Sequence, residues 1–213
     1  MSNIMELILV IPVLLLSLSI HEYSHGYVSY LLGDPTPKAN GRLTLNPIAH
    51  LDLVGSLVLL ITRRIGWAKP VPIDPRYYKN PRKGLMLVGI AGPGSNLILA
   101  TIFALIFRTV MAFASINSVG AMGTQVSNLQ YVVLRFLILA VIVNLSLGFF
   151  NLLPIPPLDG SNILRGLIPR DLDKYLNKLQ GPIGMILLLV LAYTGILWGM
   201  ISPFVNFFLG ILI

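Results

Sequence analysis

Two histidines and a glutamate interrupt an otherwise apolar stretch near the start of the chain. In the segment SLSIHEYSHGYVSYLL, His21 and His25 are four residues apart, so they share one face of a predicted helix, with Glu22 beside them. The pattern His-Glu-x-x-His on a helix is typical of zinc hydrolases, in which both imidazoles bind the metal and the glutamate acts as general base. Ionisable side chains in an apolar segment are costly and are usually functional. The spacing therefore predicts a zinc site at this position.

The third protein ligand that a catalytic zinc requires is not given by the motif. A metzincin would carry a histidine at position 31, which is Leu31, and the remaining glutamate of the chain is Glu6. The candidates that are left are one histidine and six aspartates, namely His50, Asp34, Asp52, Asp74, Asp159, Asp171 and Asp173. Asp159 is favoured because three prolines in NLLPIPPLDG, residues 151–160, end a predicted helix and allow the chain to turn.

The composition indicates an integral membrane protein. Of the 213 residues, 55% are hydrophobic and 11% are charged, and a soluble domain carries about twice that charged fraction. The net charge of +7 does not indicate nucleic-acid binding, because the basic residues gather beside apolar segments, seven of them in residues 63–83 and four in residues 165–178. The chain has no cysteine, which excludes disulfides and thiolate metal sites.

Four apolar segments are long enough to cross a bilayer, which takes about 20 residues. They are Ile4–Leu32, Leu85–Phe107, Tyr131–Leu153 and Ile183–Ile213. The last contains Gly195, Gly199 and Pro203, so we expect it to be kinked or broken in two. The run Leu53–Ile61 is too short to span and is interpreted as a re-entrant or interfacial helix, with Asn46 as its N-cap and Pro47 in its first turn.

The distribution of charge predicts the orientation in the membrane. The basic loops 63–83 and 165–178 are expected in the cytoplasm, and loop 108–130 is expected outside, provided that Leu53–Ile61 does not cross. The N-terminus is expected outside, and its apolar run lacks the basic region and cleavage site of a removable signal peptide. His21 and Asp159 then both lie toward the cytoplasmic side.

Several motifs, in this order along the chain, resemble those of the site-2 proteases, a family of intramembrane zinc metalloproteases. They are HEYSH at 21–25, NPIAHLD at 46–52, GWAKPVPIDP at 66–75, AGPGSN at 91–96 and NLLPIPPLDG at 151–160. The resemblance implies one zinc ion per chain, held by His21, His25 and Asp159, with Glu22 activating the water. It also implies that Asn151 hydrogen-bonds the substrate carbonyl or the oxyanion. The chain looks like the short branch, a single domain over residues 1–213 without a PDZ or regulatory domain.

Other polar residues are expected to support this site or the helix packing. Asn144 lies on the third span and Asn96 near the middle of the second, so each either bonds between helices or supports the ligands or the substrate. His50 and Asp52 begin the short helix, and for His50 a structural or supporting role is favoured over direct ligation. The pair Asn40-Gly41 at residues 40–41 predicts a small β-hairpin near the active site, or a plain surface turn.

The sequence therefore predicts an all-α polytopic membrane protein with about four transmembrane helices and one short re-entrant or interfacial helix. The expected function is hydrolysis of peptide bonds within or near transmembrane segments of membrane-protein substrates, in a prokaryotic cell membrane, with the active site toward the cytoplasm. The expected partners are that substrate and the lipid bilayer, without nucleic acid. The alternative is a non-enzymatic zinc-binding membrane protein or a zinc transporter, which would place polar ligands along several spans. The sequence does not indicate the substrate, the regulator or the oligomeric state.

Overall fold

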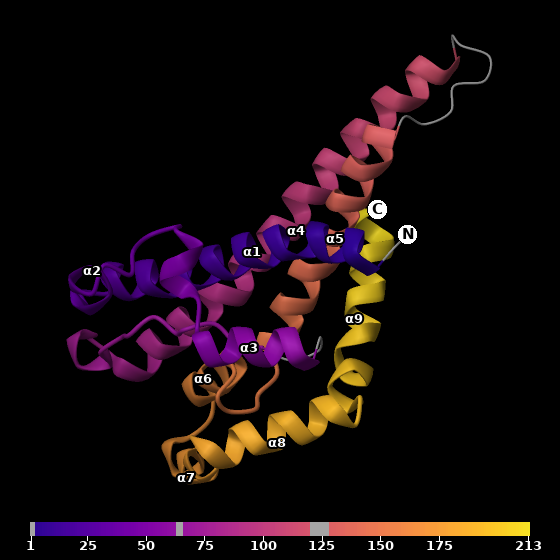
Figure 1. Ribbon diagram of the computed structural model, residues 1–213. Coiled ribbons are helices and arrows are strands. Elements are labelled where there is room, and N and C mark those ends of the chain that lie inside the picture. The colour runs from indigo at the N-terminus through magenta and orange to yellow at the C-terminus, as the bar shows by residue number, and fades with distance from the viewer. Residues whose placement is uncertain (1–2, 63–65, 120–127) are drawn as a thin grey trace.

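The computed structural model describes residues 3–62, 66–119 and 128–213, and within these ranges the chain forms helices and no β-strand (Figure 1). Its long helices are α1 (Asn3–Leu31), α4 (Pro81–Val119), α5 (Asn128–Asn151) and α9 (Ile196–Leu212). Helices α4 and α5 form a long antiparallel pair, α1 crosses this pair, and α9 packs against α5. The predicted all-α fold is confirmed.

Small and aliphatic side chains fill the space between α4, α5 and α9. The buried cluster consists of Ala100, Ala104, Val141, Leu145 and Val205. Between membrane helices the lipid is as apolar as the core, so close packing rather than removal from water holds the helices together. The alanines of α4 allow α5 to approach closely, and this contact fixes the pair on which the other elements rest.

Among the described residues, three helices are long and apolar enough to cross a membrane, namely Glu6–Leu31, Pro81–Phe113 and Leu129–Asn151. They match the first three predicted spans. The fourth predicted span, Ile183–Ile213, is broken into α8 (Pro182–Tyr193) and α9. The break lies at Gly195, whose φ of 79° is a left-handed conformation that glycine adopts without strain.

Helix α4 extends beyond both ends of the predicted span Leu85–Phe107. It begins at Pro81, and the Asn80 side chain accepts a hydrogen bond from the Lys83 backbone N–H at 3.2 Å. It continues past Arg108, whose guanidinium donates to the Ile211 carbonyl at the end of α9 at 2.6 Å. The predicted bounds covered only the apolar run. The helix itself also includes Arg82, which pairs with Asp173, and Arg108, which bonds to Ile211.

The short apolar run forms helix α3 (Leu53–Thr62), but the predicted cap belongs to another helix. Asn46 and Pro47 begin the 3-10 helix η1 (Pro47–His50), where Asn46 Oδ1 accepts a hydrogen bond from the Ile48 N–H at 3.1 Å. Asp52 precedes α3, and its Oδ1 accepts from the Gly55 N–H at 2.7 Å. Asp52 is therefore the N-cap of α3, a structural role.

The β-hairpin predicted at Asn40-Gly41 does not form. These residues end helix α2 (Thr36–Ala39), where the Asn40 N–H donates to the Thr36 carbonyl at 3.1 Å and Gly41 has a φ of 64°. A glycine that ends a helix has the same left-handed conformation as one in a hairpin turn, so the dipeptide fits both motifs. In the part of the chain that the structure describes, strand-like pairing is an isolated antiparallel bridge between Leu51 and Ala68.

The remaining short helices lie below the long ones in Figure 1 or in the connections between them. They are η2 (Pro75–Tyr77), α6 (Asp159–Leu167), η3 (Arg170–Leu172) and α7 (Asp173–Lys178). Helix α6 packs against α4. A second apolar cluster around Leu158, Leu188 and Leu197 joins the segment before α6 to α8 and α9. These contacts fix where α6 begins, and Asp159 is its first residue.

Candidate metal centre

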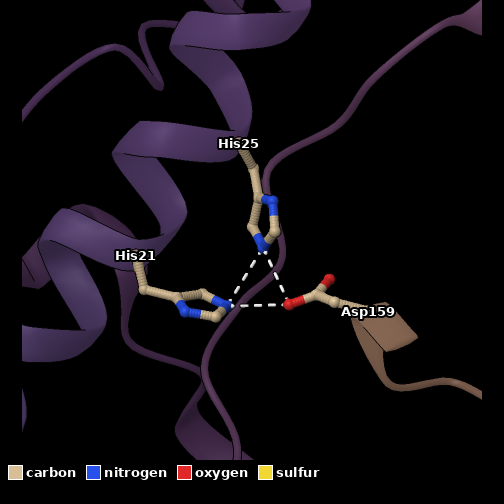
Figure 2. A group of neighbouring side chains, drawn as sticks. All are labelled: His21, His25 and Asp159. Carbon is tan, nitrogen blue, oxygen red and sulfur yellow. Dashed lines mark hydrogen bonds and ion pairs between the residues drawn. The ribbon is translucent and has the colours of Figure 1, made fainter. Parts of the chain in front are cut away.

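The side chains of His21, His25 and Asp159 converge on one point (Figure 2). His21 Nε2 and His25 Nε2 are 3.0 Å apart, and each lies 3.2 Å from Asp159 Oδ2. The two histidines project from α1, and the aspartate comes from the start of α6. The structure therefore brings together the three residues that were predicted as ligands, although 134 positions of sequence separate His25 from Asp159.

Both imidazoles are held through the nitrogen that faces away from this point. His21 Nδ1 lies 2.7 Å from Asn96 Oδ1, and His25 Nδ1 lies 2.7 Å from the Val88 carbonyl oxygen. The carbonyl oxygens of an amide side chain and of the backbone accept hydrogen bonds, so each Nδ1 carries the proton and donates. Each Nε2 then presents its lone pair to the centre, which is the tautomer that a metal ligand needs.

The amide of Asn96 is oriented by two further contacts. Its Nδ2 donates to Asn144 Oδ1 at 3.0 Å and lies 3.4 Å from the Ser17 carbonyl oxygen, and Asn144 Nδ2 donates to the Ala140 carbonyl at 2.9 Å. Both asparagines are fully buried. The chain of hydrogen bonds joins α1, α4 and α5, so Asn96 and Asn144 both bond between helices and support His21.

Asp159 is positioned by the close packing of α6 on α4. A Cβ at Gly166 would lie 2.6 Å from Met86 Cβ, so glycine is needed there, and a Cβ at Gly89 would make a tight contact of 3.0 Å with the Asp159 carbonyl oxygen. At the other end of α6, the Arg82 guanidinium of α4 donates to the carbonyls of Arg165 and Ile168. Arg82 thus satisfies the free carbonyls at the C-terminal end of α6 and holds this helix in place.

Three features of the site fit a metal ion. Asp159 Oδ2 is a buried oxygen that makes no hydrogen bond within the described residues, an arrangement that costs free energy unless a cation meets it. Two imidazoles and one carboxylate are the ligand set of known catalytic zinc sites. A Cβ at Gly92 of α4 would lie 2.6 Å from His21 Cε1 and closer still to the His25 ring, so α4 leaves only enough room for the two imidazoles.

Glu22 lies next to the ligands but is not part of the converging group. Its Oε2 accepts a hydrogen bond from the Val71 backbone N–H at 2.9 Å. Glu22 is half-buried, and its Oε1 makes no hydrogen bond within the described residues and is not among the fully buried atoms there, so Oε1 is available for a second interaction. A carboxylate placed beside a His₂Asp group is the arrangement that a general base requires.

Asn151, the last residue of α5, makes a hydrogen bond within its own helix. Its Nδ2 donates to the Leu147 carbonyl at 3.0 Å. The role of Asn151 toward a substrate stays a prediction.

His50 is buried in a different network. Its Nε2 lies 2.8 Å from the Thr44 carbonyl, and its Nδ1 lies 3.4 Å from Arg42 Nη2. Nε2–H therefore donates and Nδ1 accepts, which uses both ring nitrogens. The structural role that was favoured for His50 agrees with these contacts.

The other candidate aspartates are engaged elsewhere or lie on the surface. Asp34 accepts hydrogen bonds from the Ser29 hydroxyl and from the Thr36 and Asp74 N–H groups at 2.7–2.9 Å. Burial acts to raise the pKa of Asp34, but hydrogen bonds from Thr36, Asp74 and Ser29 outweigh it and lower the pKa. Asp74 pairs with Arg76 and Asp173 with Arg82, whereas Asp171 is exposed.

Comparison with known proteins assigns the family. The family model described as Peptidase family M50 matches residues 9–193, most of the chain. The chain belongs to peptidase family M50, the site-2 protease family. No solved structure matches this M50 chain at a significant level.

Three relatives illustrate the similarity. The Bacillus subtilis protein "Putative zinc metalloprotease YwhC" is 39% identical over 193 residues, which cover 89% of this M50 chain and 84% of YwhC. "Putative zinc metalloprotease Rip2" of Mycobacterium tuberculosis (strain ATCC 35801 / TMC 107 / Erdman) is 33% identical over 158 residues, 72% of this chain and 54% of Rip2. "Zinc metalloprotease MJ0392" of Methanocaldococcus jannaschii is 28% identical over 186 residues, 86% of this chain and 42% of MJ0392. The chain thus spans about half the length of the latter two proteins.

Proposed function

We propose that this protein is an intramembrane zinc endopeptidase that hydrolyses peptide bonds within or near transmembrane segments of membrane-protein substrates. The observation that carries the proposal is the convergence of His21, His25 and Asp159 beside the carboxylate of Glu22. His21, Glu22 and His25 project from α1, and α4 packs against both α1 and α6; α1 and α4 are apolar and long enough to cross a membrane. The names of the M50 relatives as zinc metalloproteases support the choice of metal and reaction.

His21, His25 and Asp159 would hold one zinc ion. When bound, zinc acts as a Lewis acid that polarises the peptide carbonyl and makes water acidic enough to attack at neutral pH. Asn96 and the Val88 carbonyl keep the two imidazoles oriented, because each accepts a hydrogen bond from an Nδ1–H. The ligand atoms are thus already in place before substrate arrives.

Glu22 carries the proton through the reaction. Its carboxylate accepts a proton from the attacking water as the new C–O bond forms, and then delivers this proton to the nitrogen of the departing amine as the C–N bond breaks. Asn151 is proposed to donate its amide N–H to the oxygen that gains negative charge. Its Nδ2 carries a second hydrogen besides the one that it donates to the Leu147 carbonyl.

The proposed setting is a prokaryotic cell membrane, with the site open to water from the cytoplasm. The two clusters of basic residues, at 63–83 and 165–178, support this orientation, since such loops remain on the cytoplasmic side. The substrate is proposed to be a transmembrane protein that reaches the site from the bilayer.

Substitution Glu22→Gln tests the proposed function. The variant should keep its zinc, because all three ligands are intact, and should lose cleavage by a factor of about 10² or more, because an amide cannot accept the proton. Zinc content and cleavage of a model transmembrane substrate in proteoliposomes are the two measurements. Cleavage at the wild-type rate would disprove the role of Glu22, and absence of cleavage by the wild-type protein on any transmembrane substrate would count against the proteolytic function.

A further inference from the structure

The Glu22 carboxylate is held by one backbone group of a proline-flanked segment. Its Oε2 accepts from the Val71 N–H at 2.9 Å, and Val71 stands between Pro70 and Pro72 in residues 70–72, here called the PVP segment. Proline has no backbone N–H, so Val71 carries the one donor that this segment can offer. Each proline also biases the residue before it toward an extended backbone, which limits the directions in which this N–H can point.

Arg42 holds the PVP segment in place. Its Nη2 donates to the Lys69 carbonyl at 2.6 Å, and its Nη1 donates to the Pro70 carbonyl at 3.2 Å. The side chain is 8% exposed, and among the described residues it forms no salt bridge with a carboxylate. A buried guanidinium bound to two successive carbonyls fixes both the position and the rotation of the chain just before Val71.

His50 contacts both Arg42 and the residue before the PVP segment, Lys69. It lies against Arg42 through Nδ1, and its own carbonyl accepts from the Lys69 N–H at 2.9 Å. On the opposite side, the Val71 side chain packs against α1, where a Cβ at Gly26 would lie 3.1 Å from Val71 Cγ1. The PVP segment is thus held from both sides, one turn of helix from Glu22.

We propose that Arg42 and the PVP segment position the catalytic base, with the Val71 N–H fixing Oε2 of Glu22 so that Oε1 is directed to the attacking water. This inference rests on the proposed function, because it assigns Glu22 its role as base. A free glutamate side chain has several rotamers, and most of them carry the carboxylate away from the reacting atoms. A hydrogen bond from a fixed backbone group selects one of them without neutralising the charge. Arg42 and Val71 are positioning residues and touch no reacting atom.

Replacement of one amide by an ester tests this proposal. Incorporating the α-hydroxy acid analogue of valine at position 71 of the full chain removes the N–H and keeps the side chain. It also makes the Pro70 carbonyl, which accepts from Arg42 Nη1, a weaker acceptor. The matched control is the corresponding ester at Ile73, whose N–H makes no hydrogen bond within the described residues. For the ester at position 71 we expect kcat to fall about tenfold or more, with KM and zinc content unchanged. We expect the control to keep the wild-type kcat.

Infrared difference spectra give a readout that does not depend on turnover. The carboxylate stretching band of Glu22, identified by its loss in Glu22→Gln, should shift in the ester at position 71 and stay unshifted in the control. Equal kcat for the two esters, or an unshifted band, would overturn the proposal. If the wild-type protein cleaves substrate while the position 71 ester is equally active, the proposed function stands and only the positioning role fails.

A second variant tests the part played by Arg42. Arg42→Lys keeps the charge but cannot reach two carbonyls in the same fork geometry, so kcat should fall while zinc content is retained. If Arg42 acts through Val71, the loss in Arg42→Lys combined with the ester should be smaller than the product of the two separate losses. Strictly multiplicative losses would show that Arg42 acts elsewhere, and would overturn its assignment.

Discussion

At the scale of single residues, the site combines side chains that can be recognised in the sequence with a backbone carbonyl and a glycine that cannot. His21, Glu22 and His25 could be predicted because their side chains have the chemistry of a zinc site and a recognisable spacing. Asp159 could be predicted only from the prolines before it, the expected orientation of the spans and the resemblance to the site-2 proteases. The Val88 carbonyl, which orients His25, is a backbone atom that every residue possesses. Gly92 is required because a Cβ at this position would collide with the rings of His21 and His25. Glycine has no functional group, so its sequence position alone does not indicate this role.

Gly92→Ala should disrupt the metal centre. The added methyl group would lie 2.6 Å from the His21 ring carbon Cε1 and closer still to His25, so at least one imidazole must move. We expect zinc affinity to fall about 10–100-fold, as for other disturbances of ligand orientation. Gly94→Ala, two residues along α4, is the control, since nothing lies within 4 Å of its Cβ position. Competition with a fluorescent chelator measures the affinities, and equal values for the two variants would contradict the close contact.

Asp159→Asn and His50→Ala separate the two candidates for the third ligand. Asp159→Asn should lose zinc and activity, because a neutral amide is a poor ligand in place of the carboxylate. His50→Ala should keep its zinc, because His50 contacts Arg42 and Thr44 rather than the ligands. Zinc stoichiometry after dialysis against a moderate chelator is the measurement. Metal loss from the His50 variant and retention by the Asp159 variant would reverse the assignment.

At the scale of elements, the local turn and cap motifs were located correctly but were assigned to the wrong helix or strand. Asn46 and Pro47 begin a helix, as the motif predicts, but this helix is η1 rather than α3. Asn40-Gly41 is a turn signal, but the turn ends α2 instead of joining two strands. These signals fix a backbone conformation over a few residues. Which element follows depends on tertiary contacts, such as those of Asp34 and Arg42, that a single sequence does not display.

Arg82→Gln should weaken the metal centre from a distance. Without the guanidinium, the carbonyls of Arg165 and Ile168 and the carboxylate of Asp173 lose their donor, and α6 is held less firmly on α4. Because Asp159 is the first residue of α6, we expect zinc affinity to fall by about tenfold, the lower end of the range for supporting residues. Lys83→Gln, an exposed neighbour on α4, is the control. Identical affinities in the two variants would mean that α6 is positioned by its other contacts.

At the scale of the whole molecule, apolar length predicted the first three spans but not the geometry of the C-terminal region. Residues 183–213 are apolar throughout except for single polar positions, and hydropathy does not distinguish one long helix from two shorter ones. Gly195, Gly199 and Pro203 predicted a kink or a break, without deciding between them. The packing of Leu188 and Leu197 around Leu158 determines where α8 and α9 diverge.

Single cysteines test the proposed orientation, and the natural absence of cysteine makes the protein ready for this experiment. Cysteines placed at Asn80 and at Lys174 should react with an impermeant maleimide only from the cytoplasmic face. A cysteine at Ser118, near the end of α4, should react only from the outside. Labelling of Asn80 and Lys174 from opposite faces would mean that the region of α3 crosses the bilayer, and would overturn the shared orientation of His21 and Asp159.

The distance in sequence between the two halves of the site has a consequence for biosynthesis. His25 leaves the ribosome 134 residues before Asp159, a delay of about 7–27 s at synthesis rates of 5–20 residues per second. During this interval the chain from the end of α1 through α4 and α5 is made, and the nascent chain offers two imidazoles without their carboxylate. The group of His21, His25 and Asp159 therefore cannot assemble until α6 has emerged and docked on α4.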